Sequence, residues 1–264
     1  MAVRTWLAWF IAAFAAAAHA QNSVFIDELT SPELAALVRA GRTTALVPIG
    51  GTEQSGPHIV LGKHNVRVRV LSGKIAVALG NALVAPVIAY VPEGSVDPPS
   101  AHMRFPGTLT IPETTFESVL EYAARSLRAS GFRDIVFLGD HGGYQRNEQA
   151  VAARLNRAWS STSVRVHALV DYYRAAEIAY PKALQARGYT AAEIGSHAGL
   201  ADTSLALAVD PALVRNAELD SPHADVAHGV RGDPRRANEA LGMLGVDAIV
   251  RESTAAITRA VKRQ

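Results

Sequence analysis

An alternation of short buried strands and helices constrains this chain more than any other feature of its sequence. Apolar runs at residues 44–49 and 135–138 end at glycines, and a segment with helical periodicity follows each. Further strands are predicted at 83–89 and 164–170. Strands that alternate with helices form mostly parallel sheets with helices on both faces. The sequence therefore predicts a three-layer α/β/α fold with a mostly parallel central sheet.

The helical segments complete this alternation over the length of the chain. A length of 264 residues is comfortable for one α/β domain, and no internal repeat or low-complexity linker divides it. We therefore predict a single domain over residues 21–264. Apolar spacing and helix-start signals predict helices at 31–40, 66–80, 112–130, 145–159, 173–187, 200–209 and 234–261.

Residues 1–20 differ in kind from the rest of the chain. Arg4 precedes an apolar run at 6–18, and Ala18-His19-Ala20 fits a small-x-small cleavage site. The run is shorter than the roughly 20 apolar residues that cross a bilayer, which favours a signal peptide over an uncleaved anchor. We expect residues 1–20 to be removed, and the mature protein to be periplasmic or secreted with no membrane association.

Composition narrows the chemistry that is available to the chain. There is no cysteine, so a thiol nucleophile and thiolate metal ligands are excluded, and any metal must be held by His, Asp or Glu. Removing residues 1–20, whose one formally charged side chain is Arg4, would lower the formal net charge from +2 to +1. Basic residues do not form runs interleaved with aromatics. We expect no nucleic-acid partner.

Ionisable residues follow the first and the later buried strand, where parallel sheets bind their ligands. Glu53 and His64 lie in and after the glycine-rich segment that begins at Gly50, and His141 lies in Gly139-Asp-His-Gly-Gly143. A His2Glu set is a known ligand combination for catalytic zinc. The spacing alone is equally compatible with a loop carboxylate bonded to backbone amides and with hydrogen-bonded loop histidines.

Five ordered motifs resemble the creatininase family. Pro48-Ile-Gly-Gly-Thr-Glu-Gln-Ser-Gly-Pro-His58 is similar to its Pro-Val-Gly-Ser-x-Glu-Gln-His-Gly-Pro-His pattern, and the segment ending at Gly143 is similar to its Asn-Gly-His-Gly-Gly turn. The agreement spans residues 44 to about 242 and implies a creatininase-like fold. The other three stretches are His102-Met-Arg-Phe-Pro-Gly-Thr-Leu109, Ser196-His-Ala-Gly-Leu-Ala-Asp-Thr-Ser204 and Gly229-Val-Arg-Gly-Asp-Pro234.

The resemblance implies a metal site, but this chain departs from the family pattern. The family uses two divalent ions, a His two residues after the Glu, and a bridging Asp; here these positions hold Ser55 and His64. A neutral imidazole has one lone pair to offer, so His64 cannot bridge two cations. We predict one ion per chain held by Glu53, His64 and His141, with Asp140 as a further ligand. Nitrogen-rich ligation favours zinc, with iron, manganese or nickel as alternatives.

The resemblance also suggests catalytic and substrate-binding residues. His197 matches a histidine placed to move a proton to the leaving nitrogen, and Asp202 takes the place of a glutamate near it. His102 is predicted to face the substrate, as are Ser55 and Tyr144 from the two glycine-rich loops. Family members commonly assemble as hexamers, so a homo-oligomer is expected.

The leading hypothesis is a metal-dependent amidohydrolase that cleaves a C–N bond of a small amide, cyclic amide or formamide through a metal-activated water. Two alternatives stay open. The altered positions Ser55, His64 and Leu200 are compatible with an inert binding or scaffold protein of the same fold. Cleavage of a short exported peptide differs from the leading hypothesis in substrate size.

Overall fold

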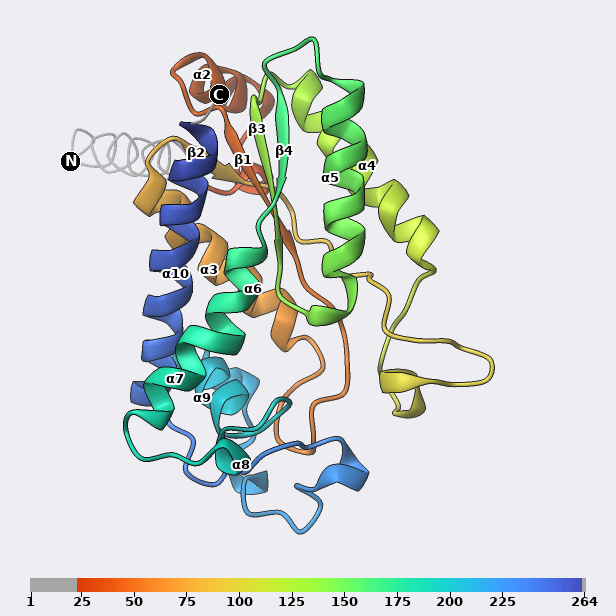
Figure 1. Cartoon of the computed structure of the whole chain (residues 1–264), viewed down its shortest axis with the longest axis vertical. Coiled ribbons are helices and arrows are strands. Elements are labelled where there is room, and N and C mark those ends of the chain that lie inside the picture. Colours follow the sequence, from red (N-terminus) through yellow and green to blue (C-terminus); the bar gives the residue numbers. More distant parts are fainter. Residues whose placement is uncertain (1–22, 263–264) are drawn as a thin grey trace, which may run out of the picture.

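A four-stranded parallel sheet runs through the centre of the molecule (Figure 1). The computed structural model describes residues 23–262, so the predicted signal peptide lies outside the described residues. The strand order is β2-β1-β3-β4, and Ala45 of β1 pairs with Leu83 on one side and with Ile135 on the other. The strands are β1 (Thr44–Ile49), β2 (Ala82–Val84), β3 (Asp134–Gly139) and β4 (Arg165–Ala168).

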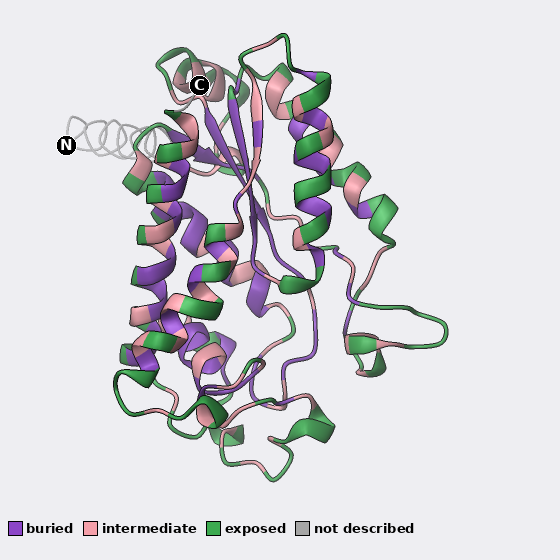
Figure 2. Cartoon of the chain, viewed as in Figure 1, coloured by how far each residue is buried: buried purple, intermediate pink, exposed green. Residues whose placement is uncertain are grey.

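Helices cover both faces of the sheet, as the sequence predicts. Side chains alternate between the faces along each strand. Leu46 and Val136 pack with residues of α3, α9 and α10, whereas Val47 and Phe137 pack with α4 and α5. Strands β1, β2 and β3 are therefore buried on both sides, and β4 at the edge of the sheet is partly buried (Figure 2). Helices on both faces confirm the three-layer α/β/α fold.

The helices lie close to their predicted positions. None of them, within residues 23–262, has the length and apolar character that a membrane crossing needs. The helices are α2 (Ser31–Arg39), α3 (Lys63–Leu79), α4 (Glu113–Ala129), α5 (Gln145–Ala158), α6 (Val170–Arg174), α7 (Tyr180–Gln185), α8 (Ala191–Ile194), α9 (Leu200–Val209) and α10 (Glu239–Val261).

Three elements differ from their predicted bounds for identifiable reasons. Strand β2 ends at Val84 because Pro86 has no N–H for the ladder, and Ile88 returns only as an isolated bridge to Ile49. The predicted helix at 173–187 is divided by a π-helical turn at Ala175–Ala179. Helix α10 begins at Glu239, where the Asn238 side chain accepts a hydrogen bond from the Leu241 amide.

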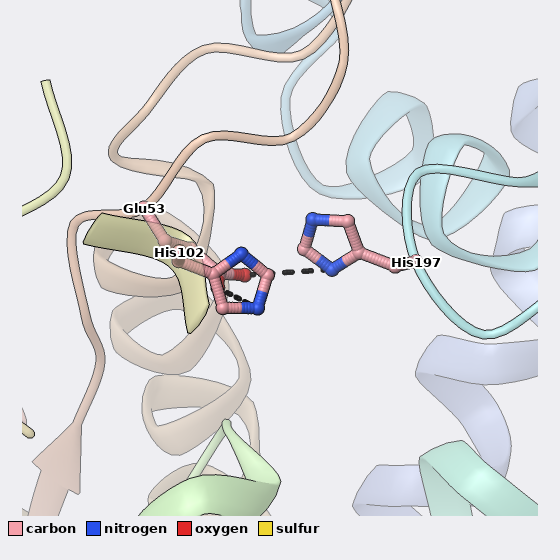
Figure 3. A group of neighbouring side chains, drawn as sticks. All are labelled: Glu53, His102 and His197. Atoms are coloured by element: carbon pink, nitrogen blue, oxygen red, sulfur yellow. Dashed lines mark ion pairs between the residues drawn. The ribbon is translucent and has the colours of Figure 1, made fainter. Parts of the chain in front are cut away.

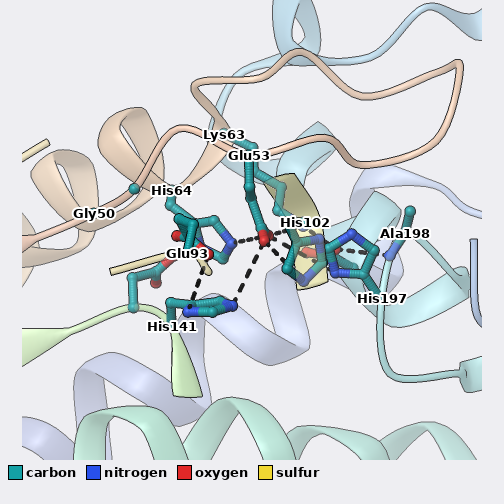
Figure 4. A network of polar contacts seen from close by, with 12 residues as sticks. Gly50, Glu53, Lys63, His64, Glu93, His102, His141, His197 and Ala198 are labelled. Atoms are coloured by element: carbon teal, nitrogen blue, oxygen red, sulfur yellow. Dashed lines mark hydrogen bonds and ion pairs between the residues drawn. The ribbon is translucent and has the colours of Figure 1, made fainter. Parts of the chain in front are cut away.

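The strand order places the ends of β1 and β3 at a topological switch point. The chain leaves β1 towards β2 on one side, and leaves β3 towards β4 on the other. Loops diverge at such a point, so a cavity opens at the carboxyl ends of the two central strands. The two glycine-rich loops singled out in the sequence follow these two strands, and their side chains converge there (Figure 4).

Candidate metal centre

Glu53 lies at the centre of this convergence, at the end of a tightly packed loop. Its side chain is 0% exposed. A Cβ atom at Gly50 would lie 2.2 Å from the Asn65 side-chain oxygen, and one at Gly51, where φ is +152°, would lie 2.8 Å from Glu93. The Gly51 amide donates to the Asn65 oxygen at 3.0 Å. Glycine at both positions lets the loop pass between α3 and Glu93 and turn the Glu53 carboxylate inward.

Helix α3 directs three cationic side chains at the buried carboxylates. Lys63, His64 and Arg67 occupy its first turns, and we call them the α3 cation cluster. His64 Nε2 lies 2.7 Å from Glu53 Oε1, and its Nδ1 lies 2.6 Å from Asp140 Oδ2 (Figure 4). Both ring nitrogens of His64 therefore face carboxylate oxygens, which leaves neither nitrogen free for a metal in this arrangement.

Lys63 and Arg67, the other two members of the cluster, share Asp202. Each also contacts one of the two carboxylates that His64 faces. The Lys63 ammonium forms an ion pair with Asp202 and lies 3.5 Å from Glu53 Oε1. Arg67 donates to Asp140 Oδ2 at 2.8 Å and to Asp202 Oδ1 at 2.7 Å. Lys63, His64 and Arg67 thus alternate with three carboxylates in one network.

The network shifts the ionisation of its members towards their charged forms. Burial disfavours the charged form of Asp202, but Lys63 and Arg67 outweigh it and hold the pKa of Asp202 well below its usual value. Burial likewise opposes ionisation of Glu53, and Lys63 and His64 keep the pKa of Glu53 low. For His64, burial and Lys63 lower the pKa, but hydrogen bonds to Asp140 and Glu53 prevail and raise it.

On the opposite side of Glu53 lie potential metal ligands that no lysine or arginine of the described residues contacts. His102 Nε2 lies 3.3 Å from Glu53 Oε2, and His141 Nε2 lies 3.6 Å from the same oxygen. His141 Nδ1 lies 3.8 Å from Glu93 Oε2. Glu53 Oε2 and both carboxylate oxygens of Glu93 are buried without a hydrogen-bond donor among the described residues. These unsatisfied oxygens point to a missing positive charge.

Two overlapping groups of donors could each hold a cation. Glu53, Glu93 and His141 offer ligand atoms that all lie within 4.8 Å of one another, and so do Glu53, His102 and His197 (Figure 3). Burial and the charge of Glu53 raise the pKa of Glu93 to about 8. Burial lowers the pKa of His141 to about 4, so its ring is neutral. Its Nδ1 accepts a hydrogen bond from the Gly143 amide at 3.2 Å, and its Nε2 is the nitrogen that faces Glu53.

His197 is held in one tautomer by the loop that carries Glu53. Its Nε2–H donates to the Gln54 carbonyl oxygen at 2.9 Å. The other nitrogen, Nδ1, is then unprotonated and lies 3.8 Å from Glu53 Oε1. Burial and Lys63 lower the pKa of His197 to about 4. The arrangement therefore presents a neutral, proton-accepting nitrogen to the site.

A cavity of about 430 Å³ opens over these groups, a size typical of small-molecule sites. One wall carries the α3 cation cluster and the histidines. The rest of the lining comes from α6, the π-helical turn, α7, α8, the loop before α9 and the segment between α9 and α10. It includes Tyr173, Glu177, Tyr180, Pro181, Gln185, Ile194, Ser196 and Arg231.

Comparison with known proteins accounts for this geometry. The creatininase family model, described as creatinine amidohydrolase, matches residues 27–257. The chain belongs to the creatininase family. It is 30% identical over 209 residues to the mycofactocin precursor peptide peptidase of Mycolicibacterium smegmatis, which covers 76% of this chain and 73% of that protein. It is 29% identical over 198 residues to the creatinine amidohydrolase of Pseudomonas putida, with 73% and 74% covered.

Solved creatininase structures superpose on nearly the whole chain. One named "Creatininase Mn" matches with a TM-score of 0.73 and 26% identity, and covers 90% of this chain and 99% of its own. The chain therefore has the metal-dependent amidohydrolase fold of the creatininase family, and membership supports a hydrolase.

The donor set that the fold brings together fits a divalent transition metal. Glu53, Glu93 and His141 supply carboxylate oxygens and a neutral imidazole, and three protein ligands leave positions for water and substrate. Such an ion would satisfy the buried Glu93 oxygens, which have no hydrogen-bond donor among the described residues. Sequence comparison with the creatininase pattern did not point to Glu93.

The structure places the four predicted ligands in different surroundings. Glu53 and His141 lie in a donor group, whereas His64 is engaged on both nitrogens. Asp140 accepts hydrogen bonds from Arg67 and, at 2.8 Å, from the Tyr172 hydroxyl, besides its contact with His64. Asp140 is therefore an anchor of the α3 cation cluster in this structure, and is in neither donor group.

The remaining predicted residues divide between the cavity and the scaffold. His102, His197 and Asp202 line the cavity, and Asp202 does so as the ion-pair partner of Lys63 and Arg67. Ser55 and Tyr144 are fully buried and do not line it. The Tyr144 hydroxyl donates to the carbonyls of Ile49 and Gly50 and accepts from the Asp140 and His141 amides, so it ties the two loops together.

Two parts of the candidate site were not predicted from the sequence: Glu93, and the pair Lys63 and Arg67. Glu93 lies in the irregular segment between β2 and α4, where no periodicity of the sequence indicates which side chain turns inward. Lys63 and Arg67 had a usable signal. They are spaced i, i+4 at the start of a helix that follows a glycine-rich loop, so both face the strand ends from one side.

Proposed function

We propose that this protein is a metal-dependent hydrolase that cleaves a C–N bond of a small amide, with an ion held by Glu53, Glu93 and His141. The orphaned Glu93 carboxylate beside His141, at the switch point of a creatininase fold, carries the proposal. When bound there, a divalent cation acidifies a water molecule and polarises the carbonyl group that is attacked. The mixed nitrogen and oxygen donors favour zinc or manganese over calcium or magnesium.

One ion per chain is the stoichiometry that the charges favour. The oxygen of Glu53 that faces α3 already has His64 at 2.7 Å and Lys63 at 3.5 Å. Asp140 and Asp202 are likewise neutralised by the α3 cation cluster. A second divalent ion on this side would face fixed positive charges without a free carboxylate.

His197 is the residue that we propose to move the proton. Its Nδ1 has a lone pair directed at the site, because Nε2–H is committed to the Gln54 carbonyl. It can take the proton of the attacking water and pass it to the leaving nitrogen, which must be protonated to depart. His102, with its ring centroid 4.8 Å from that of His197, lies where it can bind the substrate carbonyl side.

The test begins with elemental analysis of protein purified without chelator or affinity histidines. We expect about one transition-metal ion per chain, and loss of that ion in Glu93→Gln and His141→Ala. A screen of creatinine, formamides and N-acyl amines should then show hydrolysis that a chelator abolishes and the metal restores. A parent protein without metal and without turnover would instead support the inert binding protein.

Cleavage of a short peptide is the second candidate, favoured by the 30% identity to a precursor peptide peptidase. The cavity of about 430 Å³ is large enough for a terminal residue or two of a peptide. Incubating the metal-loaded protein with di- to pentapeptides, with products identified by mass spectrometry, separates this activity from that on small amides.

We also propose export of the protein to the periplasm or the medium, on the basis of the segment at 6–18 and its cleavage signature. Cell fractionation with N-terminal sequencing of the mature chain tests this. A mature N-terminus at Gln21 is the expected result, and recovery of the full-length chain in the cytoplasm would contradict it. The homo-oligomer expected from the sequence stays a prediction.

A further inference from the structure

Arg231 is fixed directly beside His197 by a backbone bridge. The Arg231 amide donates to the His197 carbonyl at 2.8 Å, and the His197 amide donates back to the Arg231 carbonyl at 3.3 Å. Residues that exchange both hydrogen bonds in an antiparallel pair project their side chains on the same face, with Cβ atoms about 5 Å apart. Since His197 points into the cavity, Arg231 emerges into the same cavity, and both residues line it.

The backbone under Arg231 is tightly packed, so the position of this side chain is built into the fold. A Cβ atom at Gly195, where φ is +67°, would lie 2.0 Å from the Arg231 carbonyl oxygen. A Cβ atom at Gly199 would lie 2.9 Å from the Gly232 Cα. Val230, just before Arg231, is 1% exposed. Such close contacts hold the base of the side chain while its guanidinium stays exposed.

The Arg231 guanidinium has no carboxylate partner among the described residues, in contrast to its neighbours. Arg235 pairs with Asp233, and Arg236 pairs with Glu193 at 2.8 Å. Within the cavity, Arg67 is bound by two carboxylates. Glu177, another acidic residue of the lining, forms no ion pair with Arg231. Arg231 is therefore the cation of the cavity lining, within residues 23–262, that no protein carboxylate neutralises.

We infer that Arg231 is a carboxylate-binding subsite, and that the preferred substrate is an amide that also carries a carboxylate, such as an N-acyl amino acid or a peptide terminus. This inference rests on the proposed function and narrows its substrate class. A guanidinium binds a carboxylate through two parallel N–H···O bonds, which fixes orientation as well as adding affinity. The bound carboxylate would hold the scissile amide between Arg231 and the side of the cavity that Glu53 and His141 line.

The test uses N-acetylglycine and N-acetylglycinamide, which differ only in a carboxylate against a carboxamide. Calorimetric titration of the metal-loaded protein measures the two dissociation constants. We expect the wild type to bind N-acetylglycine at least about tenfold more tightly. Arg231→Gln should lose this preference and Arg231→Lys should keep part of it. The control Arg235→Gln removes an exposed, ion-paired arginine nearby and should leave the preference unchanged.

Several results would overturn the subsite. Equal affinities for the two compounds in the wild type, or no binding of N-acetylglycine, would do so, as would a preference that survives in Arg231→Gln at an unchanged melting temperature. The last result would place the carboxylate on the metal instead. Hydrolysis of both compounds is measured in parallel. Turnover without a preference for the carboxylate would support the proposed function and contradict the subsite. A preference for the carboxylate without turnover would support the subsite and contradict the proposed function.

Discussion

The two sides of the candidate metal centre differ in whether their carboxylates have a basic partner from the same chain. On the α3 side, Asp140, Asp202 and one oxygen of Glu53 are each in contact with a lysine, histidine or arginine of the same chain. On the loop side, Glu93 and the other oxygen of Glu53 face His141, whose ring burial keeps neutral. Glu53, Glu93 and Asp140 are all buried, but only the α3 side contains its own positive charge.

This difference suggests that one side of the site stabilises the fold and that the other binds a ligand. A buried carboxylate without a partner costs several kcal/mol, so the fold tolerates it only if it is protonated or a cation binds. The α3 side is complete without a ligand and holds the scaffold together. The loop side is incomplete without one, and the same carboxylate, Glu53, belongs to both. Each prediction below alters one side and asks whether the other responds.

The largest effect is expected at Glu53, which both donor groups share. Glu53→Ala removes a ligand from either candidate ion position and also leaves Lys63 and His64 without one acceptor. We expect metal affinity to fall by more than about 100-fold, with loss of the ion on dialysis. Elemental analysis after dialysis measures this. His223→Ala, an exposed histidine outside the cavity, is the control and should keep its metal; retention in Glu53→Ala would refute the donor assignment.

The next largest effect is on stability, at Lys63. Lys63→Met leaves Asp202 with Arg67 alone in a buried setting, and removing one partner from a buried pair costs about 3 kcal/mol. Urea denaturation with and without added metal measures the change in the free energy of unfolding. The matched control is Lys74→Met, at an exposed position of the same helix, which should change little. Equal stabilities of the two variants would show that the α3 cation cluster does not hold the scaffold.

A smaller effect distinguishes His64 from His141. His64 sits between two carboxylates, so His64→Gln should lower metal affinity by less than about tenfold while destabilising the fold. His141→Ala should instead lose the ion and leave stability nearly unchanged. Competition with a chromophoric chelator measures both affinities. If His64→Gln loses the metal as completely as His141→Ala, the ligand set predicted from the sequence is right and the division of the site into two sides fails.

The two sides of the site also differ in how much of them could be predicted from the sequence. Strand–helix alternation predicts the parallel sheet because hydrophobic periodicity is a local property, and the glycine-rich loops after the two central strands locate Glu53 and His141. The roles of His64 and Glu93 depend on which side chains meet across 11 and 40 residues from Glu53, and spacing carries no such information. His64 has the chemistry of a ligand; only the structure shows that both of its ring nitrogens face carboxylates, Asp140 and Glu53.

The smallest effect concerns a buried carboxylate that has neither a fixed cation nor a ligand cavity. Glu148 on α5 is 1% exposed, and neither oxygen has a hydrogen-bond donor among the described residues. Burial raises the pKa of Glu148 well above its usual value, so the folded protein holds a proton that the unfolded chain releases above about pH 4.3. The stability from this group is therefore fully present below that pH and declines as pH rises through the folded-state pKa.

Glu148→Gln removes this titration while keeping the shape of the side chain. The variant should match the wild type near pH 4 and become more stable by roughly 1 kcal/mol or more at pH 8, where the wild type must keep Glu148 protonated or bury its charge. Urea denaturation at both pH values measures the difference, and Glu218→Gln, an exposed glutamate, should show none. A stability difference that does not depend on pH would mean that Glu148 has a partner in the folded protein. In that case a buried carboxylate without a hydrogen-bond donor would not by itself indicate a cation site. Only His141 and Glu53 beside Glu93 would then indicate that an ion binds there.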